Sequence, residues 1–349
     1  MIAIISNKID QYQNYNFKIN FSKNYNKELK KCFNYNIKNH PNFLMNQLQL
    51  QSIKNNFKID HYENIKNKDK IKFFIFLDVI HHEEIISKKP KFLIILEYKS
   101  IKPILYKKKN HKYFDKVFTF EKGLLDKKKY FFYNGLNVIP KKTFILNNKK
   151  KFSKCIFFAN RPNDNSGSYF KERIRIIDYY KDKPQDLHLY GGNWDKFAVP
   201  MNISFFKKII FYIIKIFLNF FKIKKKKYLK IWKGFSKNLI VTTSKYKYCF
   251  VIENSSTLSG RIFLSFYAGT IPIYFGDTQK IITIPKSCYI NFKKFYNFKK
   301  LENYLNNISF KEYAKIQNNI RKFINSKAYQ KYTVENDAFF IFKEMRKLI

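Results

Sequence analysis

Polar and charged side chains gather at one point of the C-terminal half, directly after a short apolar run. Residues 249–252 form that run, and Glu253, Asn254 and Ser255 follow it, with Arg261 at the start of a segment of helical periodicity. In parallel α/β sheets, ligands bind beyond the carboxyl ends of strands, beside the start of the next helix. A cation in the first turn of a helix interacts unfavourably with the helix dipole, so Arg261 does not stabilise the helix there. An anionic ligand such as a diphosphate explains its position better.

Arginine is scarce in a chain that otherwise uses lysine almost everywhere, since only six of its 69 Lys and Arg residues are arginines. Four of the six lie between residues 161 and 261, among them Arg173 and Arg175 in a predicted helix at 168–180. A retained arginine indicates that its planar fork is needed, as in phosphate binding. The alternative for Arg173 and Arg175 is that both are solvated charges on a helix surface.

The segment from residue 244 to 295 resembles the donor-binding segment of the α1,3-fucosyltransferase family. The residues that carry the resemblance are Ser-Lys-Tyr-Lys-Tyr at 244–248, Glu-Asn-Ser at 253–255, Ile-Pro-Ile-Tyr-Phe-Gly at 271–276 and Pro-Lys-Ser-Cys-Tyr-Ile at 285–290. The resemblance implies a GT-B fold of two Rossmann-like domains around a central cleft, with no tightly bound cofactor and a GDP-sugar as donor, by default GDP-fucose. It also implies that the donor is bound by Arg173, Glu253, Asn254, Ser255, Arg261 and Tyr274.

The sequence departs from the family pattern just after this strand. Ser259, Gly260 and Arg261 stand where the family has Thr-Glu-Lys, and the loop after Ser255 is about three residues shorter. Arg261 therefore takes the place of the family's lysine, and the glutamate that holds the nucleotide's ribose has no counterpart at Gly260. Two alternatives follow: a different nucleotide sugar, or a donor-binding fold that has lost catalysis.

The N-terminal half offers a candidate general base, Glu97, which ends an apolar run at 92–96. The family has a glutamate at such a strand end, followed by a Phe-Asp strand that residues 114–118 resemble. Inverting transfer needs one group to take the proton of the acceptor hydroxyl. Glu83 and Glu84 are weaker candidates, and a solvent-exposed loop residue is the alternative for Glu97.

No metal site is expected from these motifs. His81-His82-Glu83 does not match the zinc pattern HExxH, and Asp277 is not part of an Asp-x-Asp pair.

The pattern of apolar runs predicts the α/β class. Short runs that are apolar throughout are typical of buried parallel strands, and segments of helical periodicity separate them. We predict an acceptor-binding domain over 1–148, a nucleotide-sugar-binding domain over 149–330, and a C-terminal helix over 331–349 that packs on either domain. The predicted strands cover residues 2–5, 73–77, 92–96, 117–120, 155–158, 249–252 and 271–275.

The charge balance is extreme, with 69 Lys and Arg against 25 Asp and Glu and a formal net charge of +44. Such a charge favours nucleic acid or an anionic membrane, but a genome rich in A and T would also enrich lysine. No RRM, KH, helix-turn-helix or zinc-finger pattern is present, so no specific nucleic-acid partner is expected. A basic nucleic-acid-binding protein remains the alternative function, and it predicts lysines gathered on one face.

Residues 203–227 predict an amphipathic helix with a cationic stripe and a wide apolar face, lying flat on an anionic membrane. A buried core helix is the alternative. The N-terminus lacks the pattern of a signal peptide, and four scattered cysteines indicate reduced thiols. We therefore expect a cytoplasmic, peripherally membrane-associated glycosyltransferase that transfers fucose or a similar sugar to a hydroxyl of a glycan or lipopolysaccharide acceptor.

Overall fold

The structure is a computed structural model of the 349-residue chain. The chain divides into two compact units, of which unit 1 comprises Met1–Pro140 with Gln330–Ile349 and unit 2 comprises Lys141–Tyr329. The residues that the structure describes are 1–6, 42–97, 99, 102–135, 152–160, 169–192, 194, 209–210, 212–214, 216–217, 228, 230–253, 258–277, 284–295 and 297–348.

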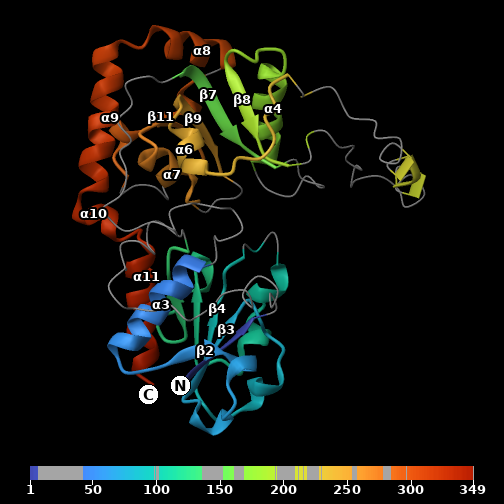
Figure 1. The fold of residues 1–349 in the computed structure, drawn as a ribbon, viewed down its shortest axis with the longest axis vertical. Helices are drawn as coiled ribbons and strands as arrows, with labels where there is room; N and C mark the ends of the chain where they lie inside the picture. Colours follow the sequence, from blue (N-terminus) through green and yellow to red (C-terminus); the bar gives the residue numbers. More distant parts are fainter. Residues whose placement is uncertain are drawn as a thin grey trace. The chain divides into compact units, whose positions relative to one another are not determined.

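Unit 1 is built on a six-stranded parallel sheet in the order β2-β1-β3-β4-β5-β6 (Figure 1). Its strands are β1 (Ile2–Ser6), β2 (Ile59–His61), β3 (Phe73–Leu77), β4 (Lys91–Ile94), β5 (Lys116–Thr119) and β6 (Tyr130–Phe132). Every residue of β3, β4 and β5 is buried. Burial on both faces explains why β3 is apolar throughout and why the interiors of β4 and β5 are apolar.

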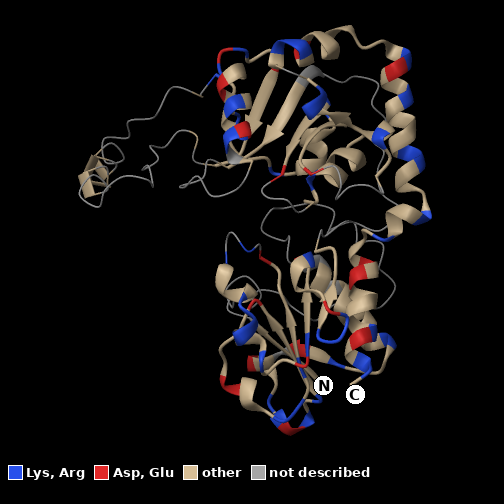
Figure 2. Cartoon of the chain, turned by 180° about the vertical axis from the view of Figure 1, so that it is seen from behind, with Lys and Arg blue, Asp and Glu red and all other residues tan. Residues whose placement is uncertain are grey.

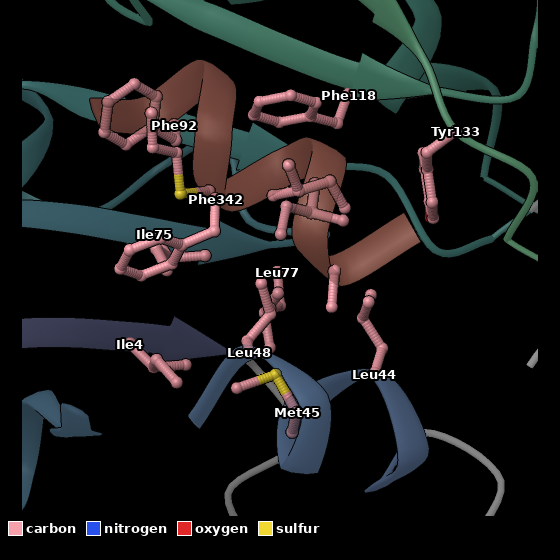
Figure 3. Close-up of a cluster of buried hydrophobic side chains, with 14 of the residues drawn as sticks. Ile4, Leu44, Met45, Leu48, Ile75, Leu77, Phe92, Phe118, Tyr133 and Phe342 are labelled. Atoms are coloured by element: carbon pink, nitrogen blue, oxygen red, sulfur yellow. The ribbon is translucent and has the colours of Figure 1, made fainter. Parts of the chain in front are cut away.

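Two helices cover one face of this sheet, α3 (Asn42–Lys54) and the C-terminal α11 (Val334–Arg346). Figure 3 shows Phe342 of α11 and Leu48 of α3 pointing toward the side chains of Ile75 and Leu77. A buried ion pair joins α11 to β5, because Lys116 Nζ lies 3.1 Å from Glu344 Oε2. The C-terminal helix is therefore part of the core of unit 1.

Unit 2 is built on a five-stranded parallel sheet in the order β11-β10-β9-β7-β8. Its strands are β7 (Phe152–Phe158), β8 (Leu187–Tyr190), β9 (Tyr246–Ile252), β10 (Ile271–Phe275) and β11 (Ile290–Asn291). Its helices include α4 (Phe170–Tyr180), α6 (Leu239–Thr243), α7 (Arg261–Tyr267), α8 (Phe298–Asn307) and α9 (Phe310–Ile324), and α10 (Lys327–Gln330) crosses from unit 2 into unit 1.

The strand order of unit 2 reverses between β7 and β9. From β7 the chain crosses through α4 to β8 on one side, and from β9 it crosses through α7 to β10 on the other. Right-handed crossovers in opposite directions place α4 and α7 on opposite faces of the sheet. A crevice at the carboxyl ends of the strands is where ligands bind at such a reversal.

The predicted α/β class with two Rossmann-like units is confirmed by these two parallel sheets. The predicted apolar runs place the starts of β7 and β9 three residues late and include no strand at β2, β6, β8 or β11. The predicted domain boundary at 148–149 lies outside the described residues. In the described part of the chain, no helix combines the length and the apolar character needed to cross a bilayer.

Candidate functional site

Two arginines from different helices meet at the carboxyl end of β9. Arg173 of α4 donates from Nη2 to the carbonyl oxygen of Ile252 at 2.7 Å, and Arg261 of α7 donates from Nη1 to the same oxygen at 3.1 Å. Ile252 is the last residue of β9, which borders the reversal of strand order. The fold thus brings two guanidinium groups, 88 residues apart in the chain, to the place where this class of sheet binds ligands.

The electrostatics of this pair favour a bound anion. Burial, and then the charge of Arg261, lower the pKa of Arg173 to about 9, while Glu253 acts in the opposite direction. Two guanidinium groups held close together repel each other, and one carboxylate offsets only one of them. The excess positive charge suits a diphosphate.

Glu253 directly follows β9, is 1% exposed and interacts electrostatically with both arginines. Burial raises the pKa of its carboxyl group, and Ser259 and the two arginines oppose that shift. After burial, Ser259 has the largest effect on this pKa, and among the described residues the buried hydroxyl of Tyr274 has no hydrogen-bond partner. Buried polar atoms usually have partners, so this cluster fits a site that a ligand completes.

Gly276 is required by the packing of this cluster. A Cβ atom there would lie 2.4 Å from the hydroxyl of Tyr274 and 2.7 Å from Cγ of Glu253. The glycine after β10 therefore lets the side chains of Tyr274 and Glu253 lie side by side.

The remaining candidates for the donor site do not contribute to this cluster in the described part of the chain. Asn254 and Ser255 lie outside the described residues. Arg175 is exposed and pairs with Glu172 at 2.8 Å on the helix surface, so of the two neighbouring arginines only Arg173 reaches β9.

A cavity of about 340 Å³ that sequence analysis missed adjoins this site. Phe275, the last residue of β10, forms part of its wall, and the carbonyl oxygen of Phe275 accepts a hydrogen bond from the amide of Glu253 at 3.0 Å. Four phenylalanines with Glu172, Arg175, Lys293 and Asn297 line it. The only signal for it in the sequence is the recurrence of phenylalanine from residue 292 to 298.

In unit 1, Glu97 lies just beyond β4 and is partly exposed. Its amide donates to Oδ1 of Asp78 at 3.3 Å, and its carbonyl oxygen accepts from the hydroxyl of Tyr106 at 2.6 Å. Sequence analysis missed Asp78, although it directly follows the apolar run of β3. Two carboxylates therefore stand at the ends of the neighbouring strands β3 and β4.

The weaker candidates for a base are engaged elsewhere. The hydroxyl of Tyr62 donates to Glu84 at 2.5 Å and contacts Glu83 at 3.4 Å, and the ring of His82 accepts from the amide of Glu84. The hydrogen bonds of Glu83 and Glu84 thus give these residues a structural role. Among the described residues, no three His, Cys, Asp or Glu side chains are grouped closely enough to hold a metal ion.

No protein-family model matches the chain, and no curated protein matches it in sequence. Similar solved structures include an α1,3-fucosyltransferase with GDP, at 14% identity over 99% of this chain and 89% of that chain, with a TM-score of 0.47. The α1,3-fucosyltransferase with GDP-fucose matches at 13% identity over 99% and 89%, with a TM-score of 0.48. Anabaena HepE in complex with UDP and glucose matches at 10% identity over 86% and 89%, with a TM-score of 0.48. At these identities the similarity is one of fold, and the chemistry has to be argued from the residues of this chain.

Proposed function

We propose that the protein is an inverting glycosyltransferase that transfers a sugar from a GDP-sugar to a hydroxyl of a glycan or lipopolysaccharide acceptor. The observation that carries this proposal is the convergence of Arg173 and Arg261 on the carbonyl oxygen of Ile252. The pair lies at the reversal of strand order in unit 2, beside the buried carboxyl group of Glu253 and the hydroxyl of Tyr274, which has no partner among the described residues. A nucleoside diphosphate matches both the charge and the place.

Each group has one task in the proposed reaction. The bond from C1 of the sugar to the diphosphate oxygen breaks, and a bond from C1 to the acceptor oxygen forms on the opposite face. Glu97 takes the proton of the acceptor hydroxyl, as a general base. Arg173 and Arg261 hold the negative charge that the departing diphosphate gains.

The choice of GDP-fucose rests on the resemblance of residues 244–295 to the α1,3-fucosyltransferase family. Gly260 lacks the family's ribose-binding carboxylate, so another nucleotide sugar is the competing donor. A thermal-shift series with GDP, UDP, CDP and ADP separates them, because a ligand that binds only the folded state raises the melting temperature. We expect the largest shift with GDP, followed by sugar transfer from GDP-fucose in a product assay. A larger shift with UDP or CDP would refute the GDP-sugar assignment.

We also propose that the segment around residues 209–217 holds the enzyme on an anionic membrane. The described apolar side chains there are between 43% exposed, at Ile209, and 63% exposed, at Ile216, which does not fit the alternative of a core helix. At 100° per residue these described side chains occupy an arc of about 200°, and the sequence pattern alone assigns Lys208, Lys215 and Lys222 to the remaining arc. A lipid surface with anionic headgroups matches both the apolar arc and the lysines.

Co-sedimentation with liposomes tests this proposal. Wild-type protein should pellet with anionic vesicles, and less so as salt rises. A variant with Ile213→Asp and Ile216→Asp should stay in the supernatant while its melting temperature still rises with GDP. If that variant pellets as wild type does, the lysines elsewhere bind the vesicles and the assignment to this segment is wrong.

The alternative of a nucleic-acid-binding protein predicts one continuous basic face. Figure 2 shows Lys and Arg spread over helices and loops of both units, with Asp and Glu among them. This distribution among the described residues favours a general enrichment of lysine over a dedicated nucleic-acid surface.

A further inference from the structure

The loop after β4, residues 95–97, is held by side chains from several parts of unit 1. The hydroxyl of Tyr133 donates to the carbonyl oxygen of Ile95. The hydroxyl of Tyr106 donates to the carbonyl oxygen of Glu97 at 2.6 Å. A strand end held in this way has a fixed backbone, whereas most loops are among the more mobile parts of a protein.

Asp78 provides the central contact of this loop. Its Oδ1 accepts from the amide of Leu96 at 2.7 Å and from the amide of Glu97 at 3.3 Å. Its Oδ2 lies 3.5 Å from Nζ of Lys102. Asp78 is 8% exposed, so these charge-assisted bonds form with little competition from water.

The backbone of Asp78 is itself unusual, with a φ of +55°. Residues other than glycine seldom adopt this left-handed region, and Asp and Asn do so more readily than the rest. Its amide also donates to the carbonyl oxygen of Ile94 in β4 at 3.1 Å. A strained conformation kept in a buried place indicates that the surrounding structure holds it there for a purpose.

We propose that Asp78 is a positioning residue that fixes the carboxylate of Glu97 for the reaction. It does so by accepting hydrogen bonds from the backbone amides of Leu96 and Glu97. The inference rests on the proposed function, in which Glu97 is the general base. Asp78 is not the proton acceptor: its Oδ1 is taken up by two amides and its Oδ2 faces Lys102. Its part is to set the direction in which the chain leaves β4.

Two substitutions at residue 78 separate positioning from proton transfer. Asp78→Asn keeps an oxygen for the two amides and tolerates the positive φ, so kcat should stay within about threefold of wild type. Asp78→Gly removes the acceptor without straining the backbone. It should lower kcat by about 10- to 100-fold while KM for the nucleotide sugar stays within about twofold, because a small misplacement of a reacting group costs about that much.

Asp115 supplies a matched control at the other end of the same strand. Its Oδ2 accepts from the amide of Lys91, the first residue of β4, at 2.7 Å. Asp115→Ala removes a side-chain-to-amide bond from β4 as Asp78→Gly does, but far from Glu97. It should lower the melting temperature and leave kcat unchanged. Amide hydrogen exchange should quicken at Leu96 and Glu97 in Asp78→Gly and stay slow there in Asp115→Ala.

The outcomes distinguish failure of the positioning role of Asp78 from failure of the proposed function. An inactive Asp78→Asn would overturn the positioning role and make Asp78 the proton acceptor. A fully active Asp78→Gly, or an equal loss of kcat in Asp115→Ala, would overturn it as well. Wild-type protein that transfers no sugar from GDP-, UDP- or CDP-sugars would overturn the proposed function itself, and the role of Asp78 in catalysis with it.

Discussion

In unit 1 the side chains at the carboxyl ends of β3 and β4 are carboxylates, Asp78 and Glu97, whereas in unit 2 those at the end of β9 include the guanidinium groups of Arg173 and Arg261. Both sheets are parallel, and both place their charged groups at the edge where such sheets bind ligands. The two units thus share a scaffold and differ in the sign of the charge that it presents.

The backbone holds the charges in both units, in opposite ways. Two amides donate to Asp78 at the end of β4, and one carbonyl oxygen accepts from both arginines at the end of β9. Carboxylates suit proton transfer and guanidinium groups suit a diphosphate. The comparison teaches that a single type of strand end can hold charges of either sign, according to the residues that surround it.

The largest expected effect is that of Glu97→Gln in unit 1. The amide keeps the size and hydrogen bonding of the side chain but loses its basicity, so turnover should fall by about 100- to 10,000-fold. Nucleotide binding, measured by the shift in melting temperature with GDP, should stay close to wild type. Turnover near wild type would mean that another carboxylate is the base.

A second effect concerns a structural acid of unit 1, Asp337 of α11. It is 3% exposed and accepts from the amides of Asn134 and Gly135 at 3.0 and 3.1 Å. Burial raises its pKa from 3.8 to about 7, although these hydrogen bonds oppose the shift.

Between those two pKa values the folded protein binds a proton at Asp337 that the unfolded chain does not. Stability is therefore lost as pH rises through this window, by up to about 4 kcal/mol. Asp337→Asn removes the titration, so its unfolding free energy should depend less on pH between 4 and 7 than that of wild type, as measured by denaturant unfolding at several pH values. Equal slopes for the two proteins would contradict the expected effect of Asp337.

Removal of an arginine from unit 2 should weaken nucleotide binding without changing the fold. Arg261→Ala loses a charge-assisted contact worth about 1.5–3 kcal/mol, so the Kd for GDP should rise by about 10- to 100-fold. Isothermal titration with GDP measures the change. Arg321→Ala is the matched control, because Arg321 is an exposed arginine of α9 in the same unit and does not line the cavity beside the site. Equal losses in the two variants would show that GDP responds only to the overall charge.

The fold could be predicted where strands are buried on both faces. The bounds predicted for β3 and β10 are those of the structure, because each is a continuous apolar run between polar residues. The strands β2, β6 and β11 have only two or three residues and lie at sheet edges, so they leave no periodicity to detect.

The site could be predicted only in part, because it depends on strand order. Glu253 and Arg261 follow one strand within nine residues and were found together. Arg173 comes from another helix, 79 residues before Ile252, and its approach to β9 follows from the pairing of β7 with β9. Asp78 was missed because neither its positive φ nor its contact with Glu97 leaves a mark in the sequence.

The smallest expected effect comes from Arg261→Lys. This substitution tests whether the geometry of the guanidinium group or its charge determines GDP binding in unit 2. An arginine fork can donate to the Ile252 carbonyl and to a phosphate together, whereas an ammonium group is a compact charge that is more strongly hydrated. Lysine keeps the charge, so the Kd for GDP should rise by only about two- to fivefold, well below the effect of Arg261→Ala. The same substitution should make GDP binding more sensitive to salt, because a hydrated point charge depends more on long-range attraction. Titrations of wild type, Arg261→Lys and Arg261→Ala with GDP at two salt concentrations measure both effects on the Kd. If Arg261→Lys binds as weakly as Arg261→Ala, the shared contact at Ile252 orients the diphosphate. If it binds as wild type does, charge alone is enough.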